Sequence, residues 1–167
     1  GNLQGAADDA AKVPKGFALN ATAASDDNRR YNRVYAATTQ YGFYTVETGA
    51  RALTTEGAPD PRAAVARTST RAADAKSTIY GVTKYSADES EIPIARYEEA
   101  QLILAEARGG AQAVAIVNAL RDAAALPHYT GATDAESVKQ LIIAERQRAL
   151  FVEGFRNYDI QRFKIPF

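Results

Sequence analysis

The chain has 167 residues, of which 46% are apolar and 24% are charged, a composition typical of a folded domain and too apolar for wholesale disorder. Its 20 basic and 20 acidic residues leave a formal net charge of zero, so the basic excess expected of a nucleic-acid-binding protein is absent. It contains no cysteine, which excludes disulfides, thiolate catalysis and cysteine-based zinc sites, and no apolar run reaches the ~18 residues of a transmembrane helix.

The sequence of residues 1–90 predicts an irregular segment that is rich in loops and aromatic residues and has little β structure. The stretch "LQGAADDAAKVPKGF" can begin as a short helix, which its proline and glycine then end. A second short helix is expected near residues 46–54, before a turn at "DPR" (60–62). The stretch "STIYGVTKY" (77–85) alternates weakly between apolar and polar residues, which favours a β-ribbon. The aromatic residues gather in the middle of the segment: Tyr31, Tyr35, Tyr41, Phe43 and Tyr44.

The second half of the chain has the apolar periodicity of helices. We expect helices near residues 96–107, 111–125, 134–153 and 155–163. Only Gly109 and Gly110 separate the first two, and glycine readily adopts the left-handed conformation that ends a helix. The first two helices should therefore form an antiparallel αα-hairpin.

A capping box of Thr133 and Glu136 marks the start of the third helix. Gly154 then lets the chain change direction into the last short helix. The predicted fold class is mainly α, with an αα-hairpin, a long helix and a short terminal helix after the irregular first half.

The segment "ERQRALFVEGFRNYDIQRF" (145–163) places charged residues between apolar and aromatic ones. Glu145 falls on the apolar stripe of its helix, where a carboxylate needs a partner, and Arg148 is within reach three residues on. Acids and arginines then recur every three residues, so Arg156 is expected to lie between Glu153 and Asp159 or to pair with Glu145 on the neighbouring helix. We expect a structural ion-pair network made of Glu145, Arg148, Glu153, Arg156, Asp159 and Arg162.

Paired carboxylates could instead carry out acid–base catalysis. Each acid here has an arginine near it, and a neighbouring arginine lowers the pKa of a carboxylate rather than raising it to suit a general acid. The acidic run "ADESE" (87–91) could attract a cation, but a solvated loop is the favoured interpretation. His128 is the only histidine, and no nucleophile or phosphate-binding motif is present. We therefore expect no catalytic residue, no metal site and no cofactor.

Three stretches in the second half resemble the C-terminal part of the SusD/RagB-like family: "EIPIARYEEAQLILAEA", "IVNALRDAAALP" and "LIIAERQRALFVEGFRNYDIQRF". The family motifs are a "P-x-x-R-Y-x-E-x-x-L-I-x-A-E-A" helix, an "N-x-x-R-x-x-A-x-L-P" helix and a closing "E-R-x-x-E-L-x-x-E-G-x-R-x-x-D-L-x-R" segment. The resemblance in order and spacing covers residues 91–163.

Two departures from the family pattern stand out. Ala149 occupies the position of a second glutamate, so one ion pair of the family network should be absent. The chain is also about a third of the family's length and lacks its early tetratricopeptide-like helices. We therefore interpret residues 1–167 as a single domain, or as a C-terminal fragment of such a protein.

The resemblance implies a function in nutrient capture. SusD-like proteins are lipid-anchored nutrient-binding proteins on the outer face of the outer membrane, where they cover a TonB-dependent, SusC-like transporter and capture glycans or other oligomers without catalysis. It implies a peripheral cell-surface protein here, with any lipid anchor outside this chain and a glycan or other oligomer as ligand. The neutral net charge argues against polyanions and favours neutral oligosaccharides or peptides. Because tyrosine offers a sugar an apolar face and a polar tip, the candidate ligand-binding residues are Tyr41, Phe43 and Tyr44.

Two alternatives stay open at this point. The aromatic residues could pack loops onto the helices rather than bind a ligand. The chain could also be a truncated SusD-like scaffold subunit of a cell-surface assembly, which binds other subunits and no nutrient. The short length favours the scaffold, and the tyrosine-rich segment favours the nutrient-binding protein.

Overall fold

The computed structural model describes residues 1–26 and 29–166. The chain divides into two compact units, each described here by itself. The first, the helical unit, consists of Gly1–Leu19, Thr55–Ala58 and Ile94–Phe167. The second, the hairpin unit, consists of Asn20–Thr54 and Pro59–Pro93. Each unit is therefore assembled from segments that are separated in the sequence.

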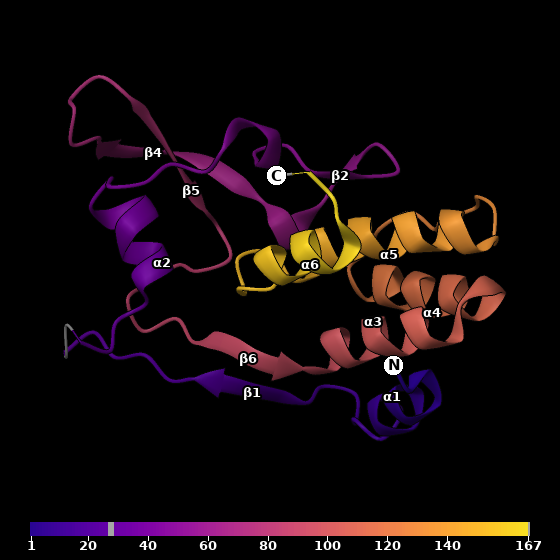
Figure 1. The fold of residues 1–167 in the computed structure, drawn as a ribbon. Helices are drawn as coiled ribbons and strands as arrows, with labels where there is room; N and C mark the ends of the chain where they lie inside the picture. Colours follow the sequence, from indigo (N-terminus) through magenta and orange to yellow (C-terminus); the bar gives the residue numbers. More distant parts are fainter. Residues whose placement is uncertain (27–28, 167) are drawn as a thin grey trace. The chain divides into compact units, whose positions relative to one another are not determined.

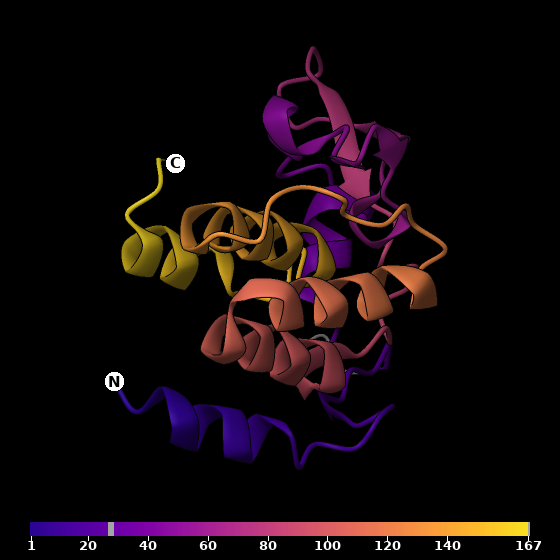
Figure 2. The same ribbon diagram turned by 90° about the vertical axis from the view of Figure 1, so that its right-hand side faces the viewer.

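The helical unit contains α1 (Leu3–Ala10), α3 (Tyr97–Arg108), α4 (Gly110–Ala123), α5 (Ala135–Ala149) and α6 (Arg156–Phe163) (Figure 1). Helix α3 packs against α1 on one side and against α4 and α5 on the other (Figure 2). Gly109 has a φ of +64°, so α3 and α4 are joined directly and form the predicted αα-hairpin. The mainly helical character of the second half follows from these elements.

The core of the helical unit lies between α3, α4 and α5. Leu102 and Val117 are completely buried at its centre. They pack with Leu120, Leu141, Ala149 and Leu150. Burial of one such aliphatic side chain stabilises the fold by about 1.5–3 kcal/mol, so this cluster contributes substantially to the stability of the helical unit.

Both ends of α5 differ from the sequence prediction. The N-cap is Asp134, whose Oδ1 accepts hydrogen bonds from the backbone N–H groups of Glu136 and Ser137, both at 3.1 Å, in place of the predicted Thr133 box. The helix ends at Ala149, four residues before the predicted end at residue 153. The early end has a backbone cause, because the chain turns into left-handed conformations at Val152 (φ 55°) and Gly154 (φ 89°).

The hairpin unit is built on one antiparallel strand pair. Strand β4 (Val65–Arg71) pairs with β5 (Thr78–Val82), so the predicted ribbon at 77–85 is one arm of a true hairpin. The unit also contains α2 (Arg33–Tyr35) and a π-helical turn, η1 (Ala36–Gln40), which packs against β5. The helix predicted near 46–54 is only a 3₁₀ turn, η2 (Thr48–Ala50), and the "DPR" turn is a 3₁₀ turn, η3 (Pro61–Ala63).

Two further strand pairs are short. Strand β1 (Ala18–Ala21) pairs with β6 (Ile92–Arg96), and β2 (Thr54–Thr55) pairs with β3 (Ala58–Pro59). Strand β6 runs directly into α3, which fixes the position of Arg96 at the start of that helix. Within residues 1–26 and 29–166, none of the helices has both the length and the apolar character needed to cross a bilayer.

Candidate functional site: an exposed aromatic surface and a buried ion-pair network

Three aromatic side chains stand out of the hairpin unit into solvent. Tyr41, Phe43 and Tyr44, which we call the aromatic surface, are 46%, 65% and 69% exposed. The rings of Tyr41 and Phe43 are stacked, with centroids 5.6 Å apart and an interplanar angle of 30°. An exposed, ordered pair of rings with a neighbouring tyrosine offers flat apolar faces beside phenolic hydroxyls, which is the chemistry that suits a sugar ring.

Main-chain hydrogen bonds of the π-helical turn hold the aromatic surface in place. The N–H of Tyr41 donates to the carbonyl of Ala36 at 2.8 Å, and the N–H groups of Phe43 and Tyr44 both donate to the carbonyl of Ala37, at 3.0 and 3.2 Å. The turn is tied to strand β4, because the hydroxyl of Thr70 donates to the carbonyl of Thr39. Single π-helical turns often occur at functional sites.

Gly42 separates the two stacked rings and can hardly be another residue. Its φ is +63°, and a Cβ at this position would lie 2.8 Å from the carbonyl oxygen of Arg71. The backbone therefore passes close to β4 between Tyr41 and Phe43. Sequence reasoning missed the π-helical turn, although the "YGF" triplet carries the signal of a turn between two aromatic residues.

The other tyrosines of this region are engaged differently. Tyr31 lies under the guanidinium of Arg33, which is 4.3 Å from its ring centroid, and the Arg33 Nη1 donates to the Tyr31 hydroxyl at 2.8 Å. The ring of Tyr80, on β5, is covered by Arg51 at 4.2 Å. Tyr41, Phe43 and Tyr44 therefore form the exposed aromatic group of this region.

The buried charges of the helical unit form ion pairs between distant parts of the chain. Glu145 has no solvent exposure, and its Oε2 accepts a hydrogen bond from the Arg121 Nε at 3.0 Å. Both oxygens of Asp159 lie 2.9 Å from the Arg146 Nε. Buried pairs of this kind fix helices in register, because a stranded carboxylate would be costly.

The structure adds partners that spacing did not suggest. Arg121, on α4, bonds Glu145, and Arg148 donates from Nη1 to the carbonyl of Ala144 at 2.7 Å. Within the part of the chain that the structure describes, Arg156 makes no ion pair. Arg162 lies 2.7 Å from Glu106 and 3.4 Å from Asp159. Local spacing could not reveal Arg121 as the partner of Glu145 or Glu106 as the partner of Arg162, because these pairs are 24 and 56 residues apart. The contact of Arg162 with Asp159 does have the predicted spacing of three residues.

Arg96 anchors the third buried acid. Its Nε and Nη2 donate to the two oxygens of Glu153 at 2.9 and 2.7 Å, and its Nη1 lies 2.7 Å from Glu98. Burial alone would lower the pKa of Arg96, but the hydrogen bonds and charges of Glu153 and Glu98 raise it above its ordinary value. The bidentate geometry suits a permanent structural link better than proton transfer.

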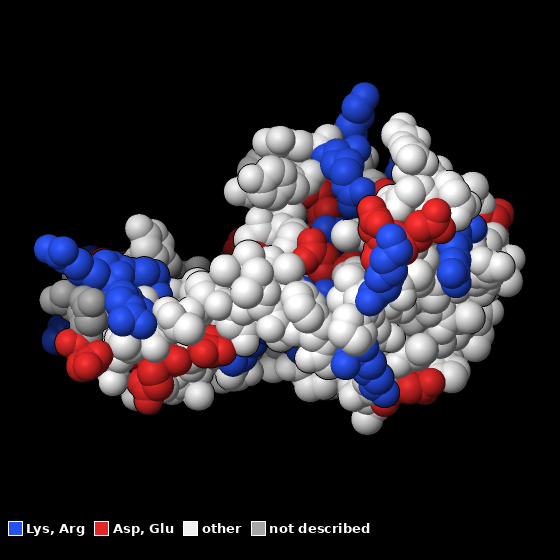
Figure 3. Space-filling view, turned by 90° about the horizontal axis from the view of Figure 1, so that it is seen from below, with Lys and Arg blue, Asp and Glu red and all other residues white. Residues whose placement is uncertain are grey.

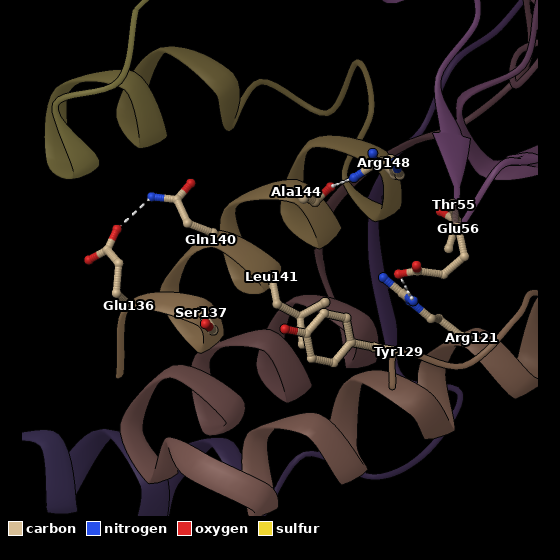
Figure 4. Close-up of a pocket in the computed structure, with 10 residues that line it drawn as sticks. All are labelled: Thr55, Glu56, Arg121, Tyr129, Glu136, Ser137, Gln140, Leu141, Ala144 and Arg148. Atoms are coloured by element: carbon tan, nitrogen blue, oxygen red, sulfur yellow. Dashed lines mark hydrogen bonds and ion pairs between the residues drawn. The ribbon is translucent and has the colours of Figure 1, made fainter. Parts of the chain in front are cut away.

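A cavity of about 420 Å³ opens in the helical unit between α5 and the segment after α4 (Figure 4). Tyr129 and Leu141 form its apolar side, and the Arg121–Glu56 pair, with its Nη1–Oε1 distance of 3.1 Å, lies at one end. On the opposite side the Gln140 amide donates to Glu136 at 2.8 Å. Much of the polar wall is thus bonded within itself, and we take the aromatic surface as the stronger candidate for ligand binding.

Comparisons with known proteins find one matching family and similar solved structures. The model of the SusD family matches residues 7–167, which extends the resemblance well upstream of residue 91. A SusD superfamily protein from Bacteroides vulgatus ATCC 8482 is 24% identical, with a TM-score of 0.53, and the match covers 80% of this chain and 33% of that one. A SusD-like protein from Bacteroides fragilis NCTC 9343 is 32% identical, with a TM-score of 0.42, over 51% of this chain and 20% of that one.

Among curated proteins, none matches the chain. The chain spans about a third and a fifth of the lengths of the two solved relatives. The likeness to the Bacteroides vulgatus protein supports the fold, whereas the family match covers nearly every residue of the chain.

Proposed function

The chain belongs to the SusD family, and on that basis we propose that it is a non-catalytic protein that binds a nutrient at the surface of the outer membrane. Its proposed ligand is an oligosaccharide. Family membership supports the general role, and the aromatic surface of the hairpin unit supports the kind of ligand. The ligand would stack on the rings of Tyr41 and Phe43, with Tyr44 beside them.

The exposed, stacked rings are the observation that carries the proposal. Exposure of three large aromatic side chains within four residues leaves apolar surface in water, which binding of a ligand would cover. Main-chain hydrogen bonds hold the backbone that carries the three rings, so the loop itself does not have to be ordered by a ligand. Preorganisation of this kind reduces the entropy lost on binding.

The charge distribution favours a neutral ligand. Formal net charge is zero, and on the face that Figure 3 presents, Lys and Arg side chains lie beside Asp and Glu side chains with no broad area of one sign. A polyanionic glycan would require an excess of basic groups to replace its counterions. A neutral oligosaccharide needs only ring faces and hydrogen-bonding groups.

The proposal is tested by a screen against neutral and charged glycans, followed by calorimetry with the best ligand. Replacement of Tyr41, Phe43 and Tyr44 together by alanine should abolish measurable binding, because weak stacking contacts act together. Replacement of Tyr158, a 73% exposed tyrosine on α6, should leave the affinity unchanged and serves as the matched control. Unchanged affinity of the triple variant, with its fold intact, would move the site elsewhere, and steady release of cleaved product would contradict a non-catalytic role.

We also propose a TonB-dependent, SusC-like transporter as the partner and a peripheral position at the cell surface. Support for the partner comes from family membership alone. Cross-linking in outer membranes, followed by identification of the linked protein, tests it. Recovery of other surface proteins without a transporter, together with no binding in the glycan screen, would favour the alternative of a scaffold subunit.

A further inference from the structure

Glu99 differs from the other acids of the helical unit that belong to the family motifs. Four of those acids are paired with arginines: Glu106 with Arg162, Glu145 with Arg121, Glu153 with Arg96, and Asp159 with Arg146. Glu99 has no ion pair or hydrogen bond from its side chain to any residue in the ranges 1–26 and 29–166. It is nevertheless only partly exposed, so its carboxylate is not fully solvated.

The Glu99 side chain lines a groove of about 400 Å³ between α1, α3 and the end of β6. The groove, which we call the α1–α3 groove, is mostly apolar. Its apolar walls are made by Ala6, Ala10, Val13, Phe17, Ala100 and Ile103. Phe17 and Ile103 are themselves exposed large hydrophobic side chains, so the groove combines open apolar surface with one carboxylate.

The cations around Glu99 are already bound to other acids. Arg96, which also lines the groove, is held by Glu153 and Glu98, and Arg146 is held by Asp159. Asp9 at the rim lies 3.0 Å from Lys12 on its own helix. Two arginines near Glu99, Arg96 and Arg146, lower its pKa, and two acids, Glu153 and Asp159, raise it.

Burial raises the pKa of the Glu99 carboxyl above its ordinary value, Arg146 lowers it, and Glu153 raises it again. The charged form of Glu99 is therefore under-stabilised in the chain alone. A further cation entering the groove would relieve this, and the groove has the volume to admit one.

We propose that the α1–α3 groove is a docking site for a partner polypeptide that presents an arginine beside an apolar side chain, the arginine binding Glu99 and the apolar side chain contacting Phe17 and Ile103. Charge complementarity selects a cationic partner. Arginine fits better than lysine, because its planar guanidinium binds a carboxylate with two hydrogen bonds and tolerates desolvation. The helical unit uses arginine for each of the four paired acids named above.

The test is an NMR titration of the full 167-residue chain with two short probes: N-acetyl-Leu-Arg-amide and N-acetyl-Leu-citrulline-amide, in which the neutral citrulline replaces arginine with the same shape. We expect saturable shifts of amides in α1 and α3 with the arginine probe, and about tenfold weaker binding of the citrulline probe. The pKa of Glu99, followed by the ¹³C shift of its carboxyl, should fall by about one to three units when the arginine probe binds.

Two variants sharpen the result. Glu99→Gln should weaken binding of the arginine probe about tenfold, whereas Glu136→Gln, which removes the same charge from α5, should leave it unchanged. Equal affinity of the unaltered chain for the two probes would overturn the proposal. This comparison does not depend on whether a variant folds. The proposal would also be overturned by shifts confined to other surfaces, or by sedimentation showing that the chain pairs with itself through Glu99, since a second copy would then be the occupant.

Discussion

Arg96 and Glu153 lie 57 residues apart and are joined by two parallel hydrogen bonds, of 2.9 and 2.7 Å. The same guanidinium also donates to the carbonyl of Ala149, the last residue of α5. A cation at the C-terminus of a helix is favoured by the helix dipole as well as by the hydrogen bond. One side chain at the start of α3 therefore holds both the end of α5 and the loop that follows it.

Replacement of Arg96 by alanine should reduce the free energy of unfolding by about 2–4 kcal/mol, because the Glu153 side chain would stay buried without its partner. Urea unfolding followed by circular dichroism measures the change. Arg96→Lys should recover only part of the loss, since an ammonium cannot reproduce the bidentate geometry. A full recovery with lysine would show that charge alone is sufficient.

Arg146→Ala and Arg156→Ala form a matched pair on the same terminal segment. Loss of Arg146 leaves the buried Asp159 carboxylate without its main partner and should reduce the free energy of unfolding by about 2–4 kcal/mol. Loss of Arg156 should change it by less than about 0.5 kcal/mol, because Arg156 makes no ion pair with the described residues.

The comparison of these two variants in one urea series also tests the partners themselves. Equal losses would mean that Arg156 carries a buried charge after all.

Gly42→Ala should distort the aromatic surface and reduce the free energy of unfolding by about 1–3 kcal/mol. The new Cβ would meet the carbonyl oxygen of Arg71 at 2.8 Å, in addition to the strain of a positive φ. Gly16→Ala is the control, because Gly16 has a φ of +81° but nothing within 4 Å of an added Cβ. Thermal unfolding of both variants separates the clash with Arg71 from the strain of a positive φ. Equal losses of stability in the two variants would contradict the close approach of Gly42 to β4.

Glu99→Gln should make the chain more stable at neutral pH. The folded-state pKa of Glu99 is raised by burial, so the folded state binds this proton more tightly than the unfolded chain does. The contribution of Glu99 to stability is therefore present below its unfolded pKa and is lost as the pH rises through the folded-state pKa. The difference between the variant and the unaltered chain should grow from about pH 4 to pH 7.

Denaturant unfolding at a series of pH values measures this difference. Glu106→Gln provides the opposite case, because Glu106 has a partner in Arg162 and its removal should not stabilise the chain. A Glu99→Gln variant that is less stable than the unaltered chain at pH 7 would show that the carboxylate makes a favourable contact within the fold.

The helices of the second half were predictable because their signals are local. Gly109 and Gly110 end one helix and begin the next, and the apolar stripe of α4 repeats within a single segment. The end of α5 was not predictable in the same way, since a continuous run of good helix formers gives no sign of the left-handed turn at Val152.

The buried ion pairs show where local spacing fails. A separation of three residues suggests Arg148 as a partner of Glu145, but it gives no sign of Arg121, which binds Glu145 from 24 residues away. Prediction of the π-helical turn fails for a similar reason, because the turn is tied to β4 by the hydrogen bond from Thr70 to Thr39, which are 31 residues apart. The three rings of the aromatic surface were named from composition, and their role stays a proposal.

In the π-helical turn, the groups that set the shape of the loop are different from the side chains that we propose to bind a ligand. Backbone bonds to Ala36 and Ala37 and the close approach at Gly42 hold the loop, whereas the side chains at positions 41, 43 and 44 project into solvent. Evolution can therefore exchange those three side chains with little penalty to folding. Under the proposed function, point changes at these three positions would alter the ligand preference while the fold stays intact.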